Sequence, residues 1–188
     1  MFKPATITLI ACGLLVTFAV TSAPQSSVPP SRGVGHAISA DAIAARDLTV
    51  FPDGRGLPPG RGTAKEGRQV FATQCAVCHG PQGEGSNDFP RLAGGVGTLT
   101  SASPVLTVGS YWPYATTLWD YNRRAMPYMQ PGSLKTSEVY AVSAYILHLN
   151  GIVKEDEVLD EHTLPLIRMP NREGFVKDAR PDWKAKPQ

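Results

Sequence analysis

The residues with the clearest chemical potential are two cysteines and a histidine, in the run Cys75-Ala76-Val77-Cys78-His79. Two thiols three positions apart lie on one side of a helical turn, so both can add to the vinyl groups of one haem. The histidine that follows is then directed at the iron. We therefore predict one covalent haem c held by Cys75 and Cys78, with His79 as an axial ligand.

Three other interpretations of this run compete with haem attachment. A zinc site needs four ligands, and with no second cysteine pair it would recruit histidines scattered along the chain, from His36, His148 and His162. A thioredoxin-like redox pair would follow a strand in a βαβ unit, which the sequence lacks, and would not need His79. A disulfide inside the run closes a very small loop and contributes little stability.

The iron then needs a sixth ligand or an open position. Met126 lies 47 residues after His79 and directly before Pro127, which fixes the direction of the chain there. A thioether at a rigid turn is a suitable iron ligand, so Met126 is the prediction. Met129 and Met169 are chemically equivalent, and a second histidine ligand is the remaining alternative.

Three helices are predicted to position these groups. Thr63 and Glu66 form a capping box that opens a helix running to about Gln74. A second helix is expected over residues 114–124. Thr136 is the expected cap of the third helix, which carries apolar residues at helical spacing and stops at 150–151. No segment alternates as a strand does, so we predict an all-α domain over residues 63–151.

Composition separates the rest of the chain from this domain. Residues 24–62 are rich in Pro, Gly and Ser and predict an irregular N-terminal arm, with a short helical turn within 41–47. Residues 152–188 show little apolar periodicity and predict a C-terminal tail that lies on the surface or frays. Both segments look too poor in core residues to be stable alone. The net charge of +2 argues against a nucleic-acid partner.

The N-terminus has the pattern of a secretory signal. Lys3 precedes an apolar stretch from about Ile7 to Val20, and small residues follow up to Ala23. Residues 1–23 are therefore a predicted signal peptide, and the mature protein is expected in the periplasm. Two alternatives would attach it to a membrane: lipidation at Cys12, or retention of the apolar stretch as an anchor.

The order of these motifs resembles class I cytochrome c. The resemblance covers about residues 63–151 and includes Gly67 and Phe71, the CxxCH run, residues 90–92, Met126-Pro127 and a last helix with Tyr145. It implies three main helices around one covalently bound haem. It also implies that Gly67 and Phe71 cross the last helix near Tyr145, which would pack on the haem, and that Arg91 pairs with a haem propionate.

A narrower resemblance covers more of the chain. Several strings are similar to the cytochrome subunit of sulfane dehydrogenase complexes (SoxD-like); they lie at residues 53–60, 111–121, 123–127, 138–142, 147–153 and 169–171. This resemblance implies a molybdenum partner of the sulfite-oxidase type, thiosulfate oxidation, and a downstream electron acceptor. Some members carry a second haem domain, whereas this chain has one CxxCH run.

These patterns favour a mono-haem protein that transfers single electrons and is not an enzyme by itself. Haem c cycles between ferric and ferrous iron, and the protein tunes it through its ligands and burial. A free electron shuttle to a terminal oxidase is one alternative. A haem enzyme or gas sensor is another, and it would require an open sixth site on the iron.

Overall fold

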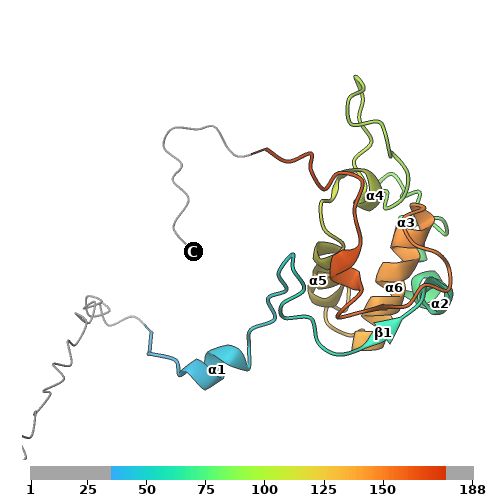
Figure 1. Ribbon diagram of the computed structural model, residues 1–188. Coiled ribbons are helices and arrows are strands. Elements are labelled where there is room, and N and C mark those ends of the chain that lie inside the picture. The colour runs from blue at the N-terminus through green and yellow to red at the C-terminus, as the bar shows by residue number, and fades with distance from the viewer. Residues whose placement is uncertain (1–34, 177–188) are drawn as a thin grey trace, which may run out of the picture. The chain divides into compact units, whose positions relative to one another are not determined.

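The computed structural model describes residues 35–176, so the predicted signal peptide and Cys12 lie outside the described part. The chain divides into two units after Ala44, and the helix α1 (Ala40–Ala44) belongs to the first. The second unit holds every other element (Figure 1). Its helices are α2 (Ala64–Gln74), α3 (Ala76–His79), α4 (Val108–Tyr111), α5 (Ala115–Ala125), α6 (Thr136–Leu149) and the short 3-10 helix η1 (Leu164–Leu166).

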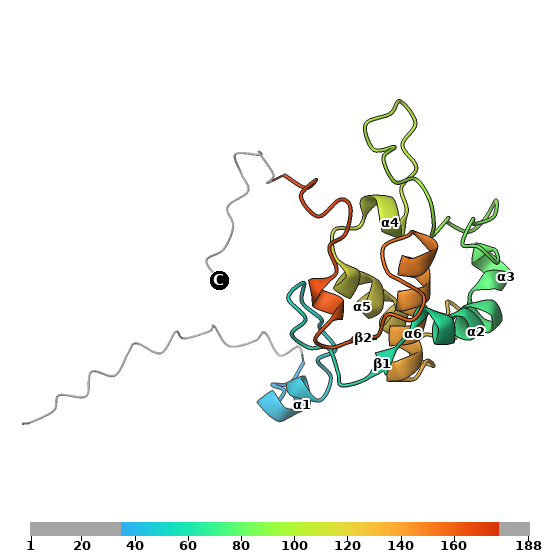
Figure 2. The same cartoon turned by 45° about the vertical axis from the view of Figure 1, so that its right-hand side comes forward.

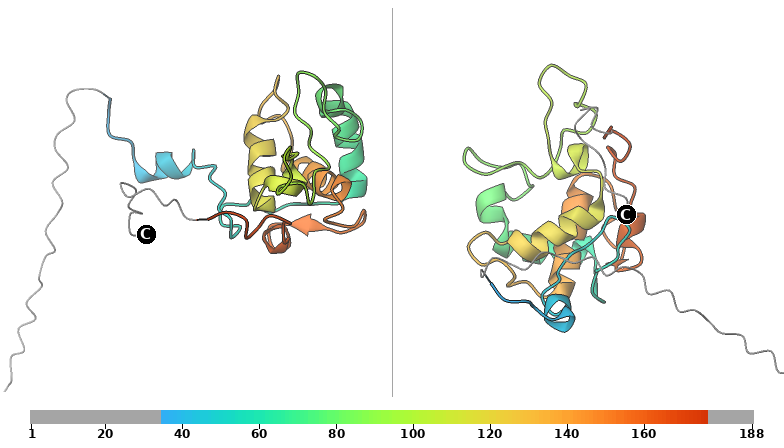
Figure 3. Two further views of the ribbon diagram at one scale, coloured as in Figure 1. Left: turned by 90° about the horizontal axis from the view of Figure 1, so that it is seen from above. Right: turned by 90° about the vertical axis from the view of Figure 1, so that its left-hand side faces the viewer.

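The most buried element is α6, and the other long helices pack on it. It lies between α2 and α5, which are on opposite sides of it in Figures 1 and 3. Every residue of α6 from Val139 to Leu147 is buried. The all-α prediction with three main helices is confirmed, and α5 and α6 match their predicted ranges to within one residue.

The start of α2 is the predicted capping box. The Thr63 hydroxyl accepts the backbone N–H of Glu66 at 3.2 Å, and the Glu66 carboxylate accepts the N–H of Thr63 at 2.8 Å. The cap of α6 differs from the prediction. Lys135, not Thr136, is the N-cap, because its extended backbone presents its N–H to the Glu138 carboxylate at 2.8 Å.

The crossing of α2 and α6 depends on a glycine. A Cβ at Gly67 would lie 1.9 Å from the carbonyl oxygen of Ala141, so no larger residue allows this approach. One turn later, the rings of Phe71 and Tyr145 pack at 5.2 Å between centroids. The crossing implied by the resemblance is therefore present.

Two features at the ends of the domain were not predicted. A small antiparallel pair exists, formed by β1 (Arg61–Gly62) and β2 (Leu159–Asp160), with Arg61 opposite Asp160. Two-residue strands are too short to produce an alternating pattern, so the sequence did not reveal them. The tail is also not poor in core residues, because four of its side chains are buried: Val153, Leu159, Leu164 and Met169.

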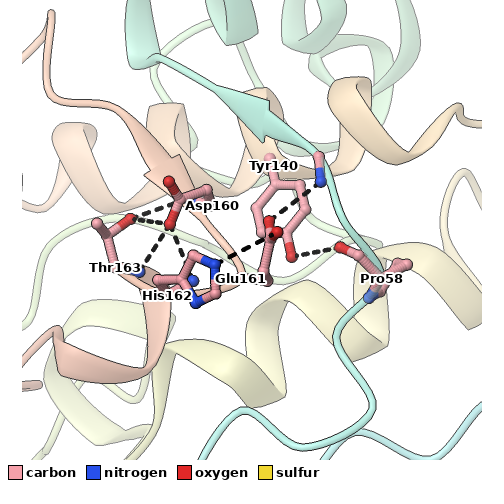
Figure 4. A network of polar contacts seen from close by, with 7 residues as sticks. Pro58, Tyr140, Asp160, Glu161, His162 and Thr163 are labelled. Atoms are coloured by element: carbon pink, nitrogen blue, oxygen red, sulfur yellow. Dashed lines mark hydrogen bonds and ion pairs between the residues drawn. The ribbon is translucent and has the colours of Figure 1, made fainter.

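A polar network joins the arm, α6 and the tail on the side of the strands (Figure 4). The Tyr140 hydroxyl donates to the carbonyl of Pro58 at 3.0 Å. The Glu161 carboxylate accepts the N–H of Gly60 at 3.2 Å. Asp160 accepts the N–H of Thr163 at 2.8 Å, which closes a turn before η1. Residues 58–62 and 159–163 are thus held by directional bonds as well as by apolar contact.

Candidate haem-binding site

The second unit contains a cavity of about 440 Å³ between the helices that carry the predicted ligands. One wall comes from the CxxCH run at α3, and another comes from α5 and the residues after it, on the other side of α6 (Figure 2). The lining brings together nearly all predicted site residues. They are Cys75, Cys78, His79, Arg91 and Met126, joined by apolar and aromatic side chains from Phe89, Leu92, Leu106, Trp112, Leu118, Tyr121, Tyr128 and Ile146.

The cysteine wall has the helical geometry that haem attachment needs. The N–H groups of Cys78 and His79 both donate to the carbonyl of Cys75, at 3.1 and 3.0 Å, so the two sulfurs share one turn. Both cysteines are free and half-buried. Burial, and to a smaller extent the neighbouring Cys78, raises the pKa of the Cys75 thiol to about 11. An unattached Cys75 therefore stays protonated near neutral pH.

The histidine is oriented by the loop that follows it. The Nδ1–H group of His79 donates to the Pro90 carbonyl at 2.8 Å, and the ring is only 8% exposed. This bond assigns the proton to Nδ1 and leaves Nε2 bare as a metal donor. The loop itself is closed by the N–H of Leu92, which donates to the Gly83 carbonyl at 2.8 Å.

Asn150 ties this loop to the last helix. Its amide nitrogen donates to the carbonyls of Leu92 and Ile146, at 3.1 and 2.8 Å, and its amide oxygen accepts the N–H of Gly94 at 3.0 Å. The sequence predicts residue 150 only as the end of a helix. Its role in holding the histidine side of the cavity depends on contacts across 56 and 58 positions, which no local pattern reveals.

The methionines are clearly separated by the fold. Met126 is the C-cap of α5 and lines the cavity. Met129 is 84% exposed, and Met169 is 1% exposed within the apolar core; neither lines the cavity. Among residues 35–176, His79 is also the one histidine in the lining.

Two residues taken from the resemblance have different placements. Arg91 lines the cavity, and its Nε–H donates to the Glu84 carbonyl at 3.2 Å, so its side chain is held at the edge of the site. Tyr145 is not part of the lining. Its ring packs on Phe71 at the crossing of α2 and α6, which the structure assigns to helix packing.

Several lining residues are of types that do not by themselves suggest a role at a haem site. Leu118 and Asn122 come from α5, eight and four positions before Met126, and therefore share its helix face. That spacing was the one signal that could have found them. Trp112 and Tyr121 line the cavity with their rings edge to face at 5.8 Å.

The donor set and the lining fit haem c. Two thiols on one turn, a bare imidazole nitrogen and a thioether surround a mostly apolar cavity, which is the environment a covalently attached haem requires. Within residues 35–176, no helix is both long enough and apolar enough to cross a bilayer.

Comparison with known proteins agrees with this site. The family model for cytochrome c matches residues 64–150. A chain in the crystal structure of the sulfane dehydrogenase SoxCD from Paracoccus pantotrophus is 43% identical, with a TM-score of 0.73; the match covers 81% of this chain and 75% of that one.

Two curated proteins are more distant relatives. A thiosulfate dehydrogenase from Psychrobacter arcticus is 30% identical over 121 residues, and the cbb3-type cytochrome c oxidase subunit FixP from Bradyrhizobium diazoefficiens is 30% identical over 91 residues. The matches cover 59% and 46% of this chain but only 35% and 30% of those proteins. This chain therefore spans about a third of the length of each of those proteins. By its family model, its solved relative and its CxxCH geometry, this chain belongs to the cytochrome c family and carries covalent haem c.

Proposed function

We propose that this chain is a periplasmic electron carrier that takes single electrons from the molybdenum subunit of a sulfane or sulfite dehydrogenase and passes them to a downstream acceptor. The observation that carries the proposal is the cavity itself, which combines the CxxCH wall with Met126 in a chain 43% identical to one from SoxCD. Bound haem c supplies reversible one-electron chemistry at iron.

The axial ligands in this proposal are His79 and Met126. His79 offers a bare Nε2 because Nδ1–H is held by the Pro90 carbonyl, and Met126 is the methionine of the lining. Two protein ligands leave no open position for a substrate, as an electron carrier requires. Arg91, at the edge of the cavity, is the proposed partner of a haem propionate.

Exchange of Met126 tests the ligation. Met126→Ala should abolish the weak near-infrared sulfur-to-iron band of the ferric protein and allow rapid carbon monoxide binding by the ferrous protein. Met129→Ala is the matched control, because that side chain is 84% exposed, and it should leave both properties unchanged. Rapid carbon monoxide binding by the unchanged protein would instead indicate an open sixth site.

Electrons need a contact surface near the cavity. Four large hydrophobic side chains of the lining are also exposed: Phe89 at 39%, Leu106 at 55%, Tyr121 at 47% and Tyr128 at 73%. Val77, inside the CxxCH run, is 88% exposed. Apolar side chains around a cavity mouth suit brief docking of a redox partner, since they exclude water without many fixed polar bonds.

The arm supplies a second surface for the dehydrogenase subunit. Ile38, Ile43, Leu48 and Phe51 are between 40% and 54% exposed within fourteen residues. Such a run is costly in water and gains stability when another protein covers it. We propose that the arm lies against the molybdenum subunit, which the narrower resemblance implies.

The partner assignment is tested with the isolated subunits. Sulfite or a sulfane-carrying protein should reduce the haem only when the molybdenum subunit is present. Replacing Ile38 and Ile43 with serine should weaken the complex, whereas Leu166→Ser, at an 80% exposed apolar residue of the tail, should not. Reduction by an unrelated dehydrogenase, with no response to any sulfur donor, would contradict the sulfur assignment.

Export is tested by mass. The periplasmic form should begin at Pro24 and should exceed the mass of that polypeptide by one haem, which acid-acetone extraction does not remove. A colourless protein with stoichiometric zinc would contradict haem attachment. An intact N-terminal segment in the membrane fraction would replace the proposed signal peptide with an anchor.

Two other functions are favoured by specific matches. The match to the oxidase subunit FixP favours a carrier that delivers electrons to a terminal oxidase. The match to thiosulfate dehydrogenase favours a haem enzyme. Direct reduction by thiosulfate, with no second protein present, would select the enzyme over both carriers.

A further inference from the structure

A buried polar pair joins α5 to α6 beside the haem cavity. Asn122 is 6% exposed and Ser143 is fully buried, and the Asn122 amide donates to the Ser143 hydroxyl at 3.2 Å. A buried amide requires such a partner, and two apolar side chains would fill the same space without that requirement. What the polar pair adds is direction, because a hydrogen bond fixes the rotation of one helix against the other.

On the α5 side, the pair acts on the last turn before Met126. Asn122 lies one turn earlier on the same face and lines the cavity. Its backbone carbonyl accepts the N–H of Met126 at 3.3 Å, so the methionine backbone is bound to Asn122 directly. A shift of Asn122 therefore moves the start of the Met126 segment.

On the α6 side, the pair is connected to the cysteine wall. Ser143 follows Ala141 by two positions, and the Ala141 carbonyl is the atom against which Gly67 of α2 packs. Helix α2 then runs directly into the CxxCH turn. Helix α6 therefore contacts α2 at Ala141 and α5 at Ser143, so it lies between the helix that leads to the wall of His79 and the helix that ends at Met126.

We propose that Asn122 and Ser143 are positioning residues that set the distance of the Met126 thioether from the iron. The proposal rests on the proposed function, because it requires Met126 to be the sixth ligand. Without the hydrogen bond, the last turn of α5 can rotate, and the sulfur–iron bond weakens while the haem stays attached through its thioethers.

The test uses the full-length haem protein with Ser143→Ala, Asn122→Ala and both together. Each single variant should weaken the near-infrared methionine band, shift the midpoint potential and raise the equilibrium constant for carbon monoxide binding about fivefold, the change expected from one neutral hydrogen bond. The double variant should do no more than either single variant, because the two side chains act as one unit. Thr116→Val is the control, since Thr116 is a 2% exposed hydroxyl residue of α5 that does not line the cavity.

The outcomes separate this inference from the function on which it rests. If Met126→Ala keeps the near-infrared band, Met126 is not the ligand and the proposed ligation fails. If Met126→Ala loses the band but Ser143→Ala keeps the band, the potential and the carbon monoxide affinity of the parent, only this inference is overturned. Equal shifts in Thr116→Val would also overturn it, because the effect would then be loss of core packing. Ser143→Ala removes a single oxygen and serves if Asn122→Ala fails to fold.

Discussion

The described parts of the arm and the tail have similar sequences, but they differ in the burial of their apolar side chains. Both are irregular and carry isolated apolar residues. In the arm, Ile38, Ile43 and Leu48 are 43% to 54% exposed. In the tail, Leu159, Leu164 and Met169 are at most 1% exposed. The difference teaches that burial in such segments depends on where the chain meets the core, and not on how many apolar residues it carries.

The cause of the difference lies in the anchoring of the tail. The pairing of β1 with β2 fixes Leu159 opposite Gly62, next to α6. From there η1 packs on α5. Farther on, the Asn171 amide donates to the Tyr111 carbonyl at 2.8 Å. Residues 152–171 of the tail are therefore part of the haem domain, and residues 38–51 of the arm present apolar surface that a partner can cover.

The largest expected effect comes from matched triple substitutions. Replacing Leu159, Leu164 and Met169 with serine should abolish cooperative unfolding, because each buried side chain contributes about 1.5–3 kcal/mol and the total rivals the ~5–15 kcal/mol stability of a domain. Thermal unfolding followed by circular dichroism measures this. The same exchange at Ile38, Ile43 and Leu48 should leave the melting temperature unchanged. A similar loss in both triple variants would contradict the comparison.

A pair of single substitutions within η1 sharpens the result. Leu164 is fully buried and Leu166 is 80% exposed, although they are two positions apart. Leu164→Ala should lower the free energy of unfolding by about 2–5 kcal/mol, and Leu166→Ala by less than about 0.5 kcal/mol. Urea titration of the two variants checks both values. Equal costs would show that η1 is not docked as the structure has it.

Much of the site was predictable because its chemistry is local. The CxxCH run predicted the cysteine wall. The proline after Met126 distinguished that methionine from Met129 and Met169, and neither of those two lines the cavity. The capping box of α2 was equally local. Helical periodicity predicted α6. Its N-cap lies one residue before the predicted one and was missed, because lysine is not among the residues preferred at N-caps.

The remaining features depend on contacts between distant parts of the chain. The buried residues of the tail are separated by five or six positions, which matches neither a helix nor a strand, so they could not be predicted to be buried. Asn122 and Asn150 act through partners 21 or more positions away. Tyr145 was assigned to the haem from the resemblance, whereas its ring is used at the crossing of two helices.

A smaller effect is expected from removing the hydroxyl of Tyr140, which joins α6 to residue 58. Burial, with a further contribution from Glu161, raises the pKa of Tyr140. The contribution of the neutral Tyr140 side chain to the free energy of unfolding is therefore present below the unfolded tyrosine pKa of about 10, and it is lost as the pH rises further. Tyr140→Phe should cost about 1.5 kcal/mol at pH 7, through loss of the bond to Pro58.

The pH dependence distinguishes this effect from simple loss of packing. The stability gap between the parent and Tyr140→Phe should narrow above about pH 10, since only the parent releases a tyrosine proton at this site on unfolding. Denaturant titrations from pH 7 to 11 measure the gap. Tyr128→Phe, at a 73% exposed tyrosine, is the control and should show no gap at any pH. A constant gap for Tyr140→Phe would contradict the assignment.

The smallest effect is expected from opening one hydrogen-bonded turn in the tail and one in the arm. Asp160 in the tail accepts the N–H of Thr163 at 2.8 Å, and Asp47 in the arm accepts the N–H of Thr49 at 2.9 Å. The Thr163 N–H holds the pKa of Asp160 below its usual value, and bonds from Thr49 do the same for the pKa of Asp47.

In the tail this turn precedes η1, which contributes to the core. Asp160→Ala should therefore lower the unfolding free energy by about 0.5 kcal/mol at pH 7, and the difference from the parent should disappear as the pH falls below the unfolded aspartate pKa of about 4. Asp47→Ala opens a turn whose own residues, 47–49, are all exposed, so thermal melts should show no shift. If instead Asp47→Ala lowers the melting temperature as much as Asp160→Ala, the arm is docked on the domain as firmly as the tail, and its exposed apolar residues are not a surface reserved for a partner.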